Sequence, residues 1–290
     1  MPREIIDIGA ASRLKLFSFR TSSQVRNLKA GIHKSPYKGI SPDFLEYKEY
    51  SQGDELKNID WRLYGRLDRL YVKKFEDEVN LSWCILIDKS GSMGYGSEEE
   101  TKLDYAIRLS ATLAYLLLKQ GDAVGIVDFC DEDIDILLPR TGMSAITPII
   151  EKLKSLKPNG KTILKEPVLR GIEKMSMDTA FVIVSDFLTD LASIEESLKL
   201  LRSSKKELIA FHILHPDEID FNFDGSIEFE DMEDETRVLV DAGEIREAYI
   251  KRIKDFTERL KLLFHENKSK YVFSPSNLPL EYTLLQVAYK

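Results

Sequence analysis

The chain contains 290 residues, 43% of them hydrophobic and 31% charged, which is typical of a globular protein with one large domain or one domain and a smaller appendage. It has no apolar run of the ~18–20 residues that a membrane-spanning helix requires, and its first residues lack the apolar core of a secretory signal. Both cysteines, Cys84 and Cys130, lie within apolar runs. We therefore expect buried, reduced thiols, which fit a cytoplasmic protein.

The net charge of −8 is unevenly distributed, because the first forty residues carry eight basic side chains and only two acidic ones. A basic arm ahead of an acidic body can contact an anionic partner. However, few aromatic residues are interleaved with these charges, as a nucleic-acid-binding surface would require. We expect a solvated arm that pairs with the protein's own acidic body, and no nucleic-acid partner.

Between this arm and the first apolar strand, the sequence indicates a turn at Gly53–Asp54. Trp61 follows Asp60 and stands between apolar and charged residues, where an aromatic side chain usually packs into a core. We therefore expect Trp61 to anchor a core. The alternative is that Asp54, Asp60 and Trp61 connect the N-terminal arm to a ligand site in the main domain.

From residue 81 onward, apolar strands alternate with amphipathic helices. Strands are predicted over residues 81–88, 122–129, 133–139, 179–187, 206–214 and 271–274. Helices are predicted over residues 101–121, 143–156, 163–175, 191–204, 244–270 and 278–289. Continuous apolar runs are typical of strands buried on both faces, and their alternation with helices indicates βαβ units. The fold class that we expect is α/β, with a doubly wound, mainly parallel sheet flanked by helices.

Two carboxylates and three hydroxyls follow the strands of this sheet in a pattern that favours a metal ion. Asp88 and Asp186 stand at the carboxyl ends of buried strands, where ligands bind in such sheets. Ser90 and Ser92 alternate with Asp88, so all three can turn toward one point, and Thr162 lies in a later loop beside a glycine. Hard oxygen ligands suit Mg²⁺, Mn²⁺ or Ca²⁺. The alternative is a set of turn and helix-capping residues.

The pattern Asp88-x-Ser90-x-Ser92 with the later Thr162 and Asp186 resembles the metal-ion-dependent adhesion site of von Willebrand factor A-like domains. All five positions of that site are filled in chain order. The resemblance implies a von Willebrand factor A-like, Rossmann-like fold that uses these five residues to bind a divalent metal, Mg²⁺ or else Mn²⁺ or Ca²⁺.

The segment before residue 79 is similar to the one that precedes the A-like fold in the bacterial family called domain of unknown function number 58. The matching landmarks are Gly39, Phe44, Glu49, Tyr50, Gly53, Asp54, Ile59, Asp60, Trp61, Lys73 and Glu76. The resemblance covers roughly residues 30–215 and, more loosely, the tail. It implies a partner, because members of that family are usually encoded beside MoxR-type AAA+ ATPases and are thought to be their adaptors. Many members carry membrane helices, which are not expected here.

We expect two parts in the chain. Residues 1–78 are predicted to form an N-terminal extension that packs on a main domain of residues 79–290, with a small β-hairpin insertion near residues 219–242. The insertion begins with a stretch that fits an EF-hand loop at Asp220, Asn222, Asp224, Gly225, Ile227 and Glu228. However, the twelfth position is Asp231 where the loop requires glutamate, and no helix is expected after it. We therefore predict an acidic turn that opens a hairpin.

These observations favour a metal-dependent protein–protein interaction module that binds an acidic side chain of its partner, and by resemblance this partner is a MoxR-type AAA+ ATPase. The alternative is a metal-dependent phosphohydrolase, in which the same acids activate a water. No catalytic motif supports an enzyme, since the chain lacks both the Gly-x-Ser-x-Gly elbow and a phosphate-cradling loop. We therefore expect no enzymatic activity. The oligomeric state stays open.

Overall fold

The computed structural model describes residues 5–20, 43–51, 59–67, 69–76, 81–131, 133–230, 232 and 237–289. The chain divides into two compact units, one of Met1–Ser22 with Leu81–Lys290 and one of Ser23–Asn80. The predicted turn at Gly53–Asp54 and much of the basic arm, residues 21–42, lie outside the described residues. Packing of the extension on the main domain stays a prediction.

The N-terminal residues 5–20 belong to the larger unit, whereas the sequence analysis grouped them with the extension. Strand β1 (Ser18–Phe19) pairs antiparallel with β12 (Ala288–Tyr289) near the other end of the chain. Helix α1 (Ile8–Arg13) packs against α4 (Lys102–Lys119), and the backbone N–H of Asp7 donates to Thr112 Oγ1 at 3.0 Å. The grouping differs because these contacts join residues about 100 or more positions apart, which local patterns do not reveal.

The smaller unit contains an antiparallel pair, β2 (Asp43–Glu49) and β3 (Tyr71–Glu76), and between them helix α3 (Trp61–Leu67). Trp61 does not anchor the core of this unit, so that prediction is wrong: its side chain is 63% exposed and meets the Tyr64 ring edge-on at 6.2 Å. Asp60 instead begins the helix, because its Oδ1 accepts hydrogen bonds from the backbone N–H groups of Arg62 and Leu63 at 3.0 and 3.2 Å.

A six-stranded sheet forms the centre of the larger unit, in the strand order β11-β8-β7-β4-β5-β6. Its strands are β4 (Ser82–Asp88), β5 (Ala123–Cys130), β6 (Asp133–Arg140), β7 (Thr179–Ser185), β8 (Leu208–Leu214) and β11 (Lys270–Pro275). All neighbours are parallel except β6, which runs antiparallel to β5 at the edge. This doubly wound, mainly parallel sheet confirms the predicted fold class.

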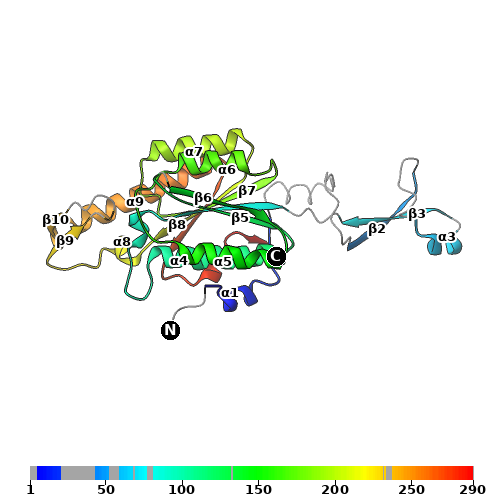
Figure 1. Ribbon diagram of the computed structural model, residues 1–290, viewed down its shortest axis with the longest axis horizontal. Helices are drawn as coiled ribbons and strands as arrows, with labels where there is room; N and C mark the ends of the chain where they lie inside the picture. The colour runs from blue at the N-terminus through cyan, green and yellow to red at the C-terminus, as the bar shows by residue number, and fades with distance from the viewer. Residues whose placement is uncertain are drawn as a thin grey trace. The chain divides into compact units, whose positions relative to one another are not determined.

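Helices cover both faces of the sheet, as Figure 1 shows, because alternate side chains of each strand point to opposite faces. Ile85 and Ile87 pack with α1, α4, α5 (Ile146–Ser155) and α10 (Leu280–Leu285). Cys84 and Leu86 pack with α6 (Lys165–Lys174), α7 (Leu191–Ser203) and α9 (Ala242–Glu266). Both cysteines are buried and form no disulfide, as expected. Because both faces of the sheet are covered by apolar side chains, polar side chains can gather at the ends of the strands.

The predicted acidic turn does open a hairpin. Helix α8 (Pro216–Asp220) has only five residues, and it is followed by strands β9 (Ser226–Glu230) and β10 (Arg237–Asp241), which pair antiparallel. An EF-hand would need a helix at that second position. Asp224, within the turn, pairs with Arg246 of α9 at 2.8 Å.

We expect Asp224→Ala to leave calcium binding unchanged, because this carboxylate pairs with Arg246 and belongs to a turn that leads into a strand. Calorimetric titration with Ca²⁺ of the wild type and the variant checks this. Loss of one bound Ca²⁺ in the variant would restore the EF-hand interpretation.

Candidate metal site

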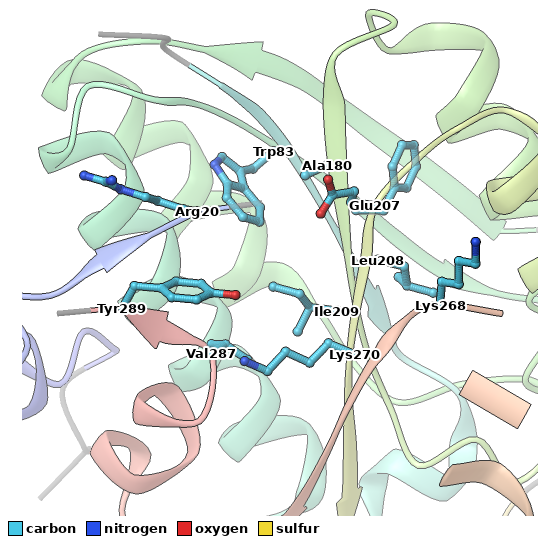
Figure 2. A pocket seen from close by; sticks show the side chains of 11 residues that line it. Arg20, Trp83, Ala180, Glu207, Leu208, Ile209, Lys268, Lys270, Val287 and Tyr289 are labelled. Carbon is cyan, nitrogen blue, oxygen red and sulfur yellow. The ribbon is translucent and has the colours of Figure 1, made fainter. Parts of the chain in front are cut away.

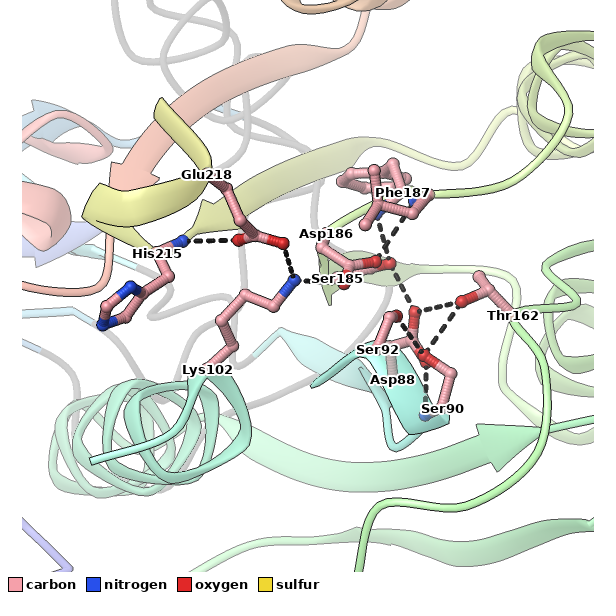
Figure 3. A network of polar contacts seen from close by, with 11 residues as sticks. Asp88, Ser90, Ser92, Lys102, Thr162, Ser185, Asp186, Phe187, His215 and Glu218 are labelled. Carbon is pink, nitrogen blue, oxygen red and sulfur yellow. Dashed lines mark hydrogen bonds and ion pairs between the residues drawn. The ribbon is translucent and has the colours of Figure 1, made fainter. Parts of the chain in front are cut away.

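The structure brings the five predicted ligands together at the carboxyl end of the central sheet (Figure 3). Strands β4 and β7 are parallel neighbours, so Asp88, which ends β4, and Asp186, which follows β7, lie at the same edge. Ser90 and Ser92 come from the loop and the 3₁₀ helix η2 (Gly91–Gly94) after β4, and Thr162 comes from the loop before α6. Asp88, Ser90, Thr162 and Asp186 are buried, and Ser92 is partly exposed.

The side-chain oxygens of this cluster lie at distances that suit a six-coordinate divalent ion. Thr162 Oγ1 is 2.9 Å from Ser90 Oγ and 3.2 Å from Asp88 Oδ2, and Ser90 Oγ is 3.1 Å from Ser92 Oγ. Adjacent ligands of an octahedral Mg²⁺ with bonds of 2.0–2.1 Å are about 2.8–3.0 Å apart, close to these distances. The donor set is therefore compatible with Mg²⁺ or Mn²⁺ in both chemistry and spacing.

Lys89 points away from the cluster, as the alternation of this segment predicts. Its Nζ pairs with Asp128 Oδ1 and Asp133 Oδ2, each at 2.7 Å, on the β5–β6 side of the loop. Lys89 thus anchors the loop while the predicted ligands face inward.

Two contacts of the cluster were missed by the sequence analysis. Ser185, the last residue of β7, donates from Oγ to Asp88 Oδ2 at 2.5 Å and accepts from the backbone N–H of Phe187 at 2.8 Å. Lys102, the first residue of α4, places Nζ 2.7 Å from Asp186 Oδ2 and 2.7 Å from Glu218 Oε1 of α8. Ser185 could have been found from its place at a strand end. Nothing in the spacing along the chain indicates the Lys102 pairs.

The two carboxyl groups differ in their electrostatic surroundings. Burial, and then the neighbouring charge of Asp186, raise the pKa of Asp88 to about 7 against the hydrogen bonds from Ser185 and Ser90. Burial opposes the ionised form of Asp186 as well, but the Lys102 ammonium together with hydrogen bonds from Leu188 and Ser92 outweighs burial and holds the pKa of that carboxyl below its ordinary value. Near neutral pH Asp186 is therefore a carboxylate. Asp88 can lose its proton when a cation binds to its carboxyl group.

A backbone segment of the hairpin insertion approaches the metal-site loop. A Cβ at Gly91 would collide with the carbonyl oxygen of Met232, and a Cβ at Gly94 would lie 3.3 Å from Met232 Cε. The position between Ser90 and Ser92 is thus restricted to glycine by the hairpin, which places the insertion next to the cluster.

Within the described part of the chain, no three His, Cys, Asp or Glu side chains form a group that could hold a metal. A metal at this edge would therefore depend on the hydroxyls of Ser90, Ser92 and Thr162. A separate cavity of about 40 Å³ lies at the opposite, amino end of the strands, among residues that include Trp83, Ile209 and Tyr289 (Figure 2). It contains none of the predicted ligands.

Among the described residues, no helix is both long and apolar enough to cross a membrane.

Comparison with known proteins gives a family match and distant relatives. The family model described as Protein of unknown function DUF58 matches residues 46–259. Uncharacterized protein Rv1480 of Mycobacterium tuberculosis (strain ATCC 25618 / H37Rv) is 20% identical over 236 residues, which cover 79% of this chain and 73% of that protein. Uncharacterized protein Mb1516 of Mycobacterium bovis matches to the same extent.

Solved structures are similar over the larger part of the chain. BatB from Bacteroides thetaiotaomicron is 16% identical with a TM-score of 0.47, covering 71% of this chain and 96% of that one. An aerotolerance-related membrane protein from Bacteroides fragilis NCTC 9343 is 19% identical with a TM-score of 0.49, covering 72% and 98%. The SpRpn10 VWA domain is 11% identical with a TM-score of 0.42, covering 71% and 94%.

Proposed function

The chain belongs to the DUF58 family of proteins of unknown function, and we propose that it is a metal-dependent protein-interaction module that captures an acidic side chain of its partner. One observation carries the proposal. The three hydroxyls and the Asp88 carboxylate lie 2.9–3.2 Å apart in successive contacts at one end of the sheet. This is the spacing of ligands around a small divalent ion.

The charges around the cluster explain why an outside carboxylate would be needed. Asp88 and Asp186 contribute two negative charges when ionised, but Lys102 lies 2.7 Å from Asp186 and compensates one of them. Ser90, Ser92 and Thr162 contribute neutral oxygens. A bound Mg²⁺ would supply an incompletely neutralised positive charge, to which a Glu or Asp of a partner protein is the complementary ligand.

The environment of Asp186 supports binding in preference to the phosphohydrolase alternative. A carboxylate that activates water as a general base is most effective when its pKa lies near the working pH. Lys102 helps to hold the pKa of Asp186 below its ordinary value, so this carboxylate is a poor base. The resemblance to proteins encoded beside ATPases suggests the partner, a MoxR-type AAA+ ATPase that presents an acidic residue on an exposed loop or helix end.

Thr162→Ala is expected to weaken partner binding at least about tenfold in Mg²⁺, because it removes one neutral ligand and leaves both carboxylates in place. Ser90→Ala should have a similar effect, whereas Thr162→Ser, which retains the hydroxyl, should bind nearly as the wild type does. Biolayer interferometry against the MoxR-type ATPase of the same organism, in Mg²⁺ and in EDTA, measures the effect. Exposed Ser155→Ala is the matched control.

An association that is equally strong in EDTA, and insensitive to substitution of all five ligands, would overturn the proposed function. Turnover of phosphoesters by the wild type, abolished by Asp88→Asn but not by Thr162→Ala, would instead favour the phosphohydrolase.

A further inference from the structure

We propose that Lys102 is a resident cation of the candidate metal site, which lowers the site's affinity for divalent ions and couples the site to α8. The inference rests on the proposed function, since it assigns a role to a side chain beside the metal ligands. Lys102 is not one of the five predicted ligands.

Lys102 is held in a closed environment between two carboxylates (Figure 3). Its side chain is 0% exposed, and Nζ lies 2.7 Å from Asp186 Oδ2 and 2.7 Å from Glu218 Oε1. Nζ also lies 6.0 Å from the centre of the Tyr95 ring. The other oxygen of Glu218 accepts the backbone N–H of His215 at 2.7 Å, at the start of α8. One ammonium group thus joins the metal-site carboxylate to the element that leads into the hairpin.

Stability by itself does not account for a lysine at this position. Burying the ammonium of Lys102 with the carboxylate of Asp186 carries a large desolvation cost, and well-packed apolar side chains often stabilise a fold as well as such a pair does. The neighbouring buried positions Leu103, Ala106 and Leu109 on α4 are apolar. The placement of a charge here is therefore better explained by its effect on the adjacent site.

The effect on a divalent ion follows from the sign of the charge. Lys102 occupies one oxygen of Asp186, so an ion that approaches this carboxylate meets a positive charge already in place. Like charges a few ångströms apart in a buried site repel strongly, which lowers the affinity for the ion. Glu218 is expected to raise the affinity for the ion, because its negative charge lies beside the ammonium and offsets part of the positive charge near Asp186.

The shared ammonium also links the ion to α8. When an ion binds near Asp186, the repulsion favours the contact of Lys102 with Glu218 over its contact with Asp186. Because such coupling is reciprocal, a partner that displaces α8 would change the affinity of the site for its ion.

Calorimetry with Mn²⁺ on the full chain tests the inference through two variants with opposite expected signs. Lys102→Met should bind Mn²⁺ at least about tenfold more tightly than the wild type, because the repelling charge is gone. Glu218→Gln should bind it several-fold more weakly, because the whole ammonium charge then lies on Asp186. Lys119→Met removes the same charge from the exposed end of the same helix and should change nothing.

Lys102→Met removes the cation from the buried Asp186 and the partly buried Glu218, so thermal unfolding in EDTA must accompany the titration. The double variant K102M/E218Q removes one of these two carboxylates and should also bind Mn²⁺ more tightly than the wild type. If neither lysine variant folds, the test rests on Glu218→Gln. Weaker Mn²⁺ binding by this variant would support the inference, and unchanged or tighter binding would contradict it. A purely structural role predicts weaker or equal Mn²⁺ binding in both lysine variants, and that result would overturn the inference.

Asp88→Asn separates this inference from the proposed function. Mn²⁺ binding that survives Asp88→Asn would refute the metal site itself. Binding that is lost in Asp88→Asn but unchanged in a folded Lys102→Met would leave the site intact and refute only the role of Lys102.

Discussion

Asp88→Asn is expected to abolish Mn²⁺ binding and, at the same time, to stabilise the metal-free protein at pH 8. Burial raises the pKa of Asp88 to about 7, so the folded chain holds a proton that the unfolded chain releases near pH 3.8. Between these values the folded state loses stability as the pH rises, and the loss is complete above about pH 7. Asparagine cannot ionise and avoids this loss.

The neighbours of Asp88 can accommodate the amide. Its Oδ1 accepts the backbone N–H of Ser90 at 2.9 Å, and an asparagine oxygen can do the same. The Ser185 and Thr162 hydroxyls, which face Oδ2 at 2.5 and 3.2 Å, can turn to accept from the amide nitrogen. The substitution therefore removes the charge and keeps hydrogen-bond partners for the side chain at position 88.

Denaturant unfolding in EDTA at pH 5.5 and pH 8 measures this effect, and the gain from Asp88→Asn should be larger at pH 8. Asp186→Asn is the matched control with the opposite expectation, because it removes a carboxylate that pairs with Lys102 and should destabilise the protein at both pH values. A variant no more stable than the wild type at pH 8 would show that Asp88 does not carry the buried charge.

Asp122→Ala is expected to lower the free energy of unfolding by about 3–5 kcal/mol without changing Mn²⁺ affinity. Asp122 is buried beside the start of β5, at the end of the sheet opposite the candidate site. Its oxygens accept from the backbone N–H of Leu81 at 2.9 Å, from Trp83 Nε1 at 2.9 Å and from Gln120 Nε2 at 3.0 Å. Alanine would leave the buried donors of Leu81 and Trp83 without this acceptor, whereas Gln120 Nε2 also donates to the carbonyl oxygen of Phe19.

Urea unfolding midpoints give the stability change, and a double-mutant cycle with Trp83→Phe isolates the indole contact. Because Phe has no N–H, the loss on Asp122→Ala should be smaller in the Trp83→Phe background. Equal losses in both backgrounds would contradict the assigned hydrogen bond, and a changed Mn²⁺ affinity would contradict the separation of the two ends of the sheet.

The sequence by itself determined the larger unit's layers and predicted five residues of the candidate site. Apolar runs such as residues 81–88 and 179–187 indicate strands buried on both faces, because a strand that contacts helices on both sides has no polar face. Asp88, Ser90 and Ser92 could be placed together because side chains at alternate positions of a short extended segment point to the same side. Asp186 could be added because parallel strands end at the same edge.

Only the tertiary structure decided which distant side chains meet. The residues at the end of the chain were predicted to be helical up to residue 289, but α10 ends at Leu285 and β12 forms because β1 supplies a partner strand. Lys102 and Glu218 are 116 positions apart, and their ion pair depends on where α8 emerges after β8. Periodicity records which face of an element is apolar, whereas such a pair depends on the order of the strands and on the path of the connections, which no local pattern contains.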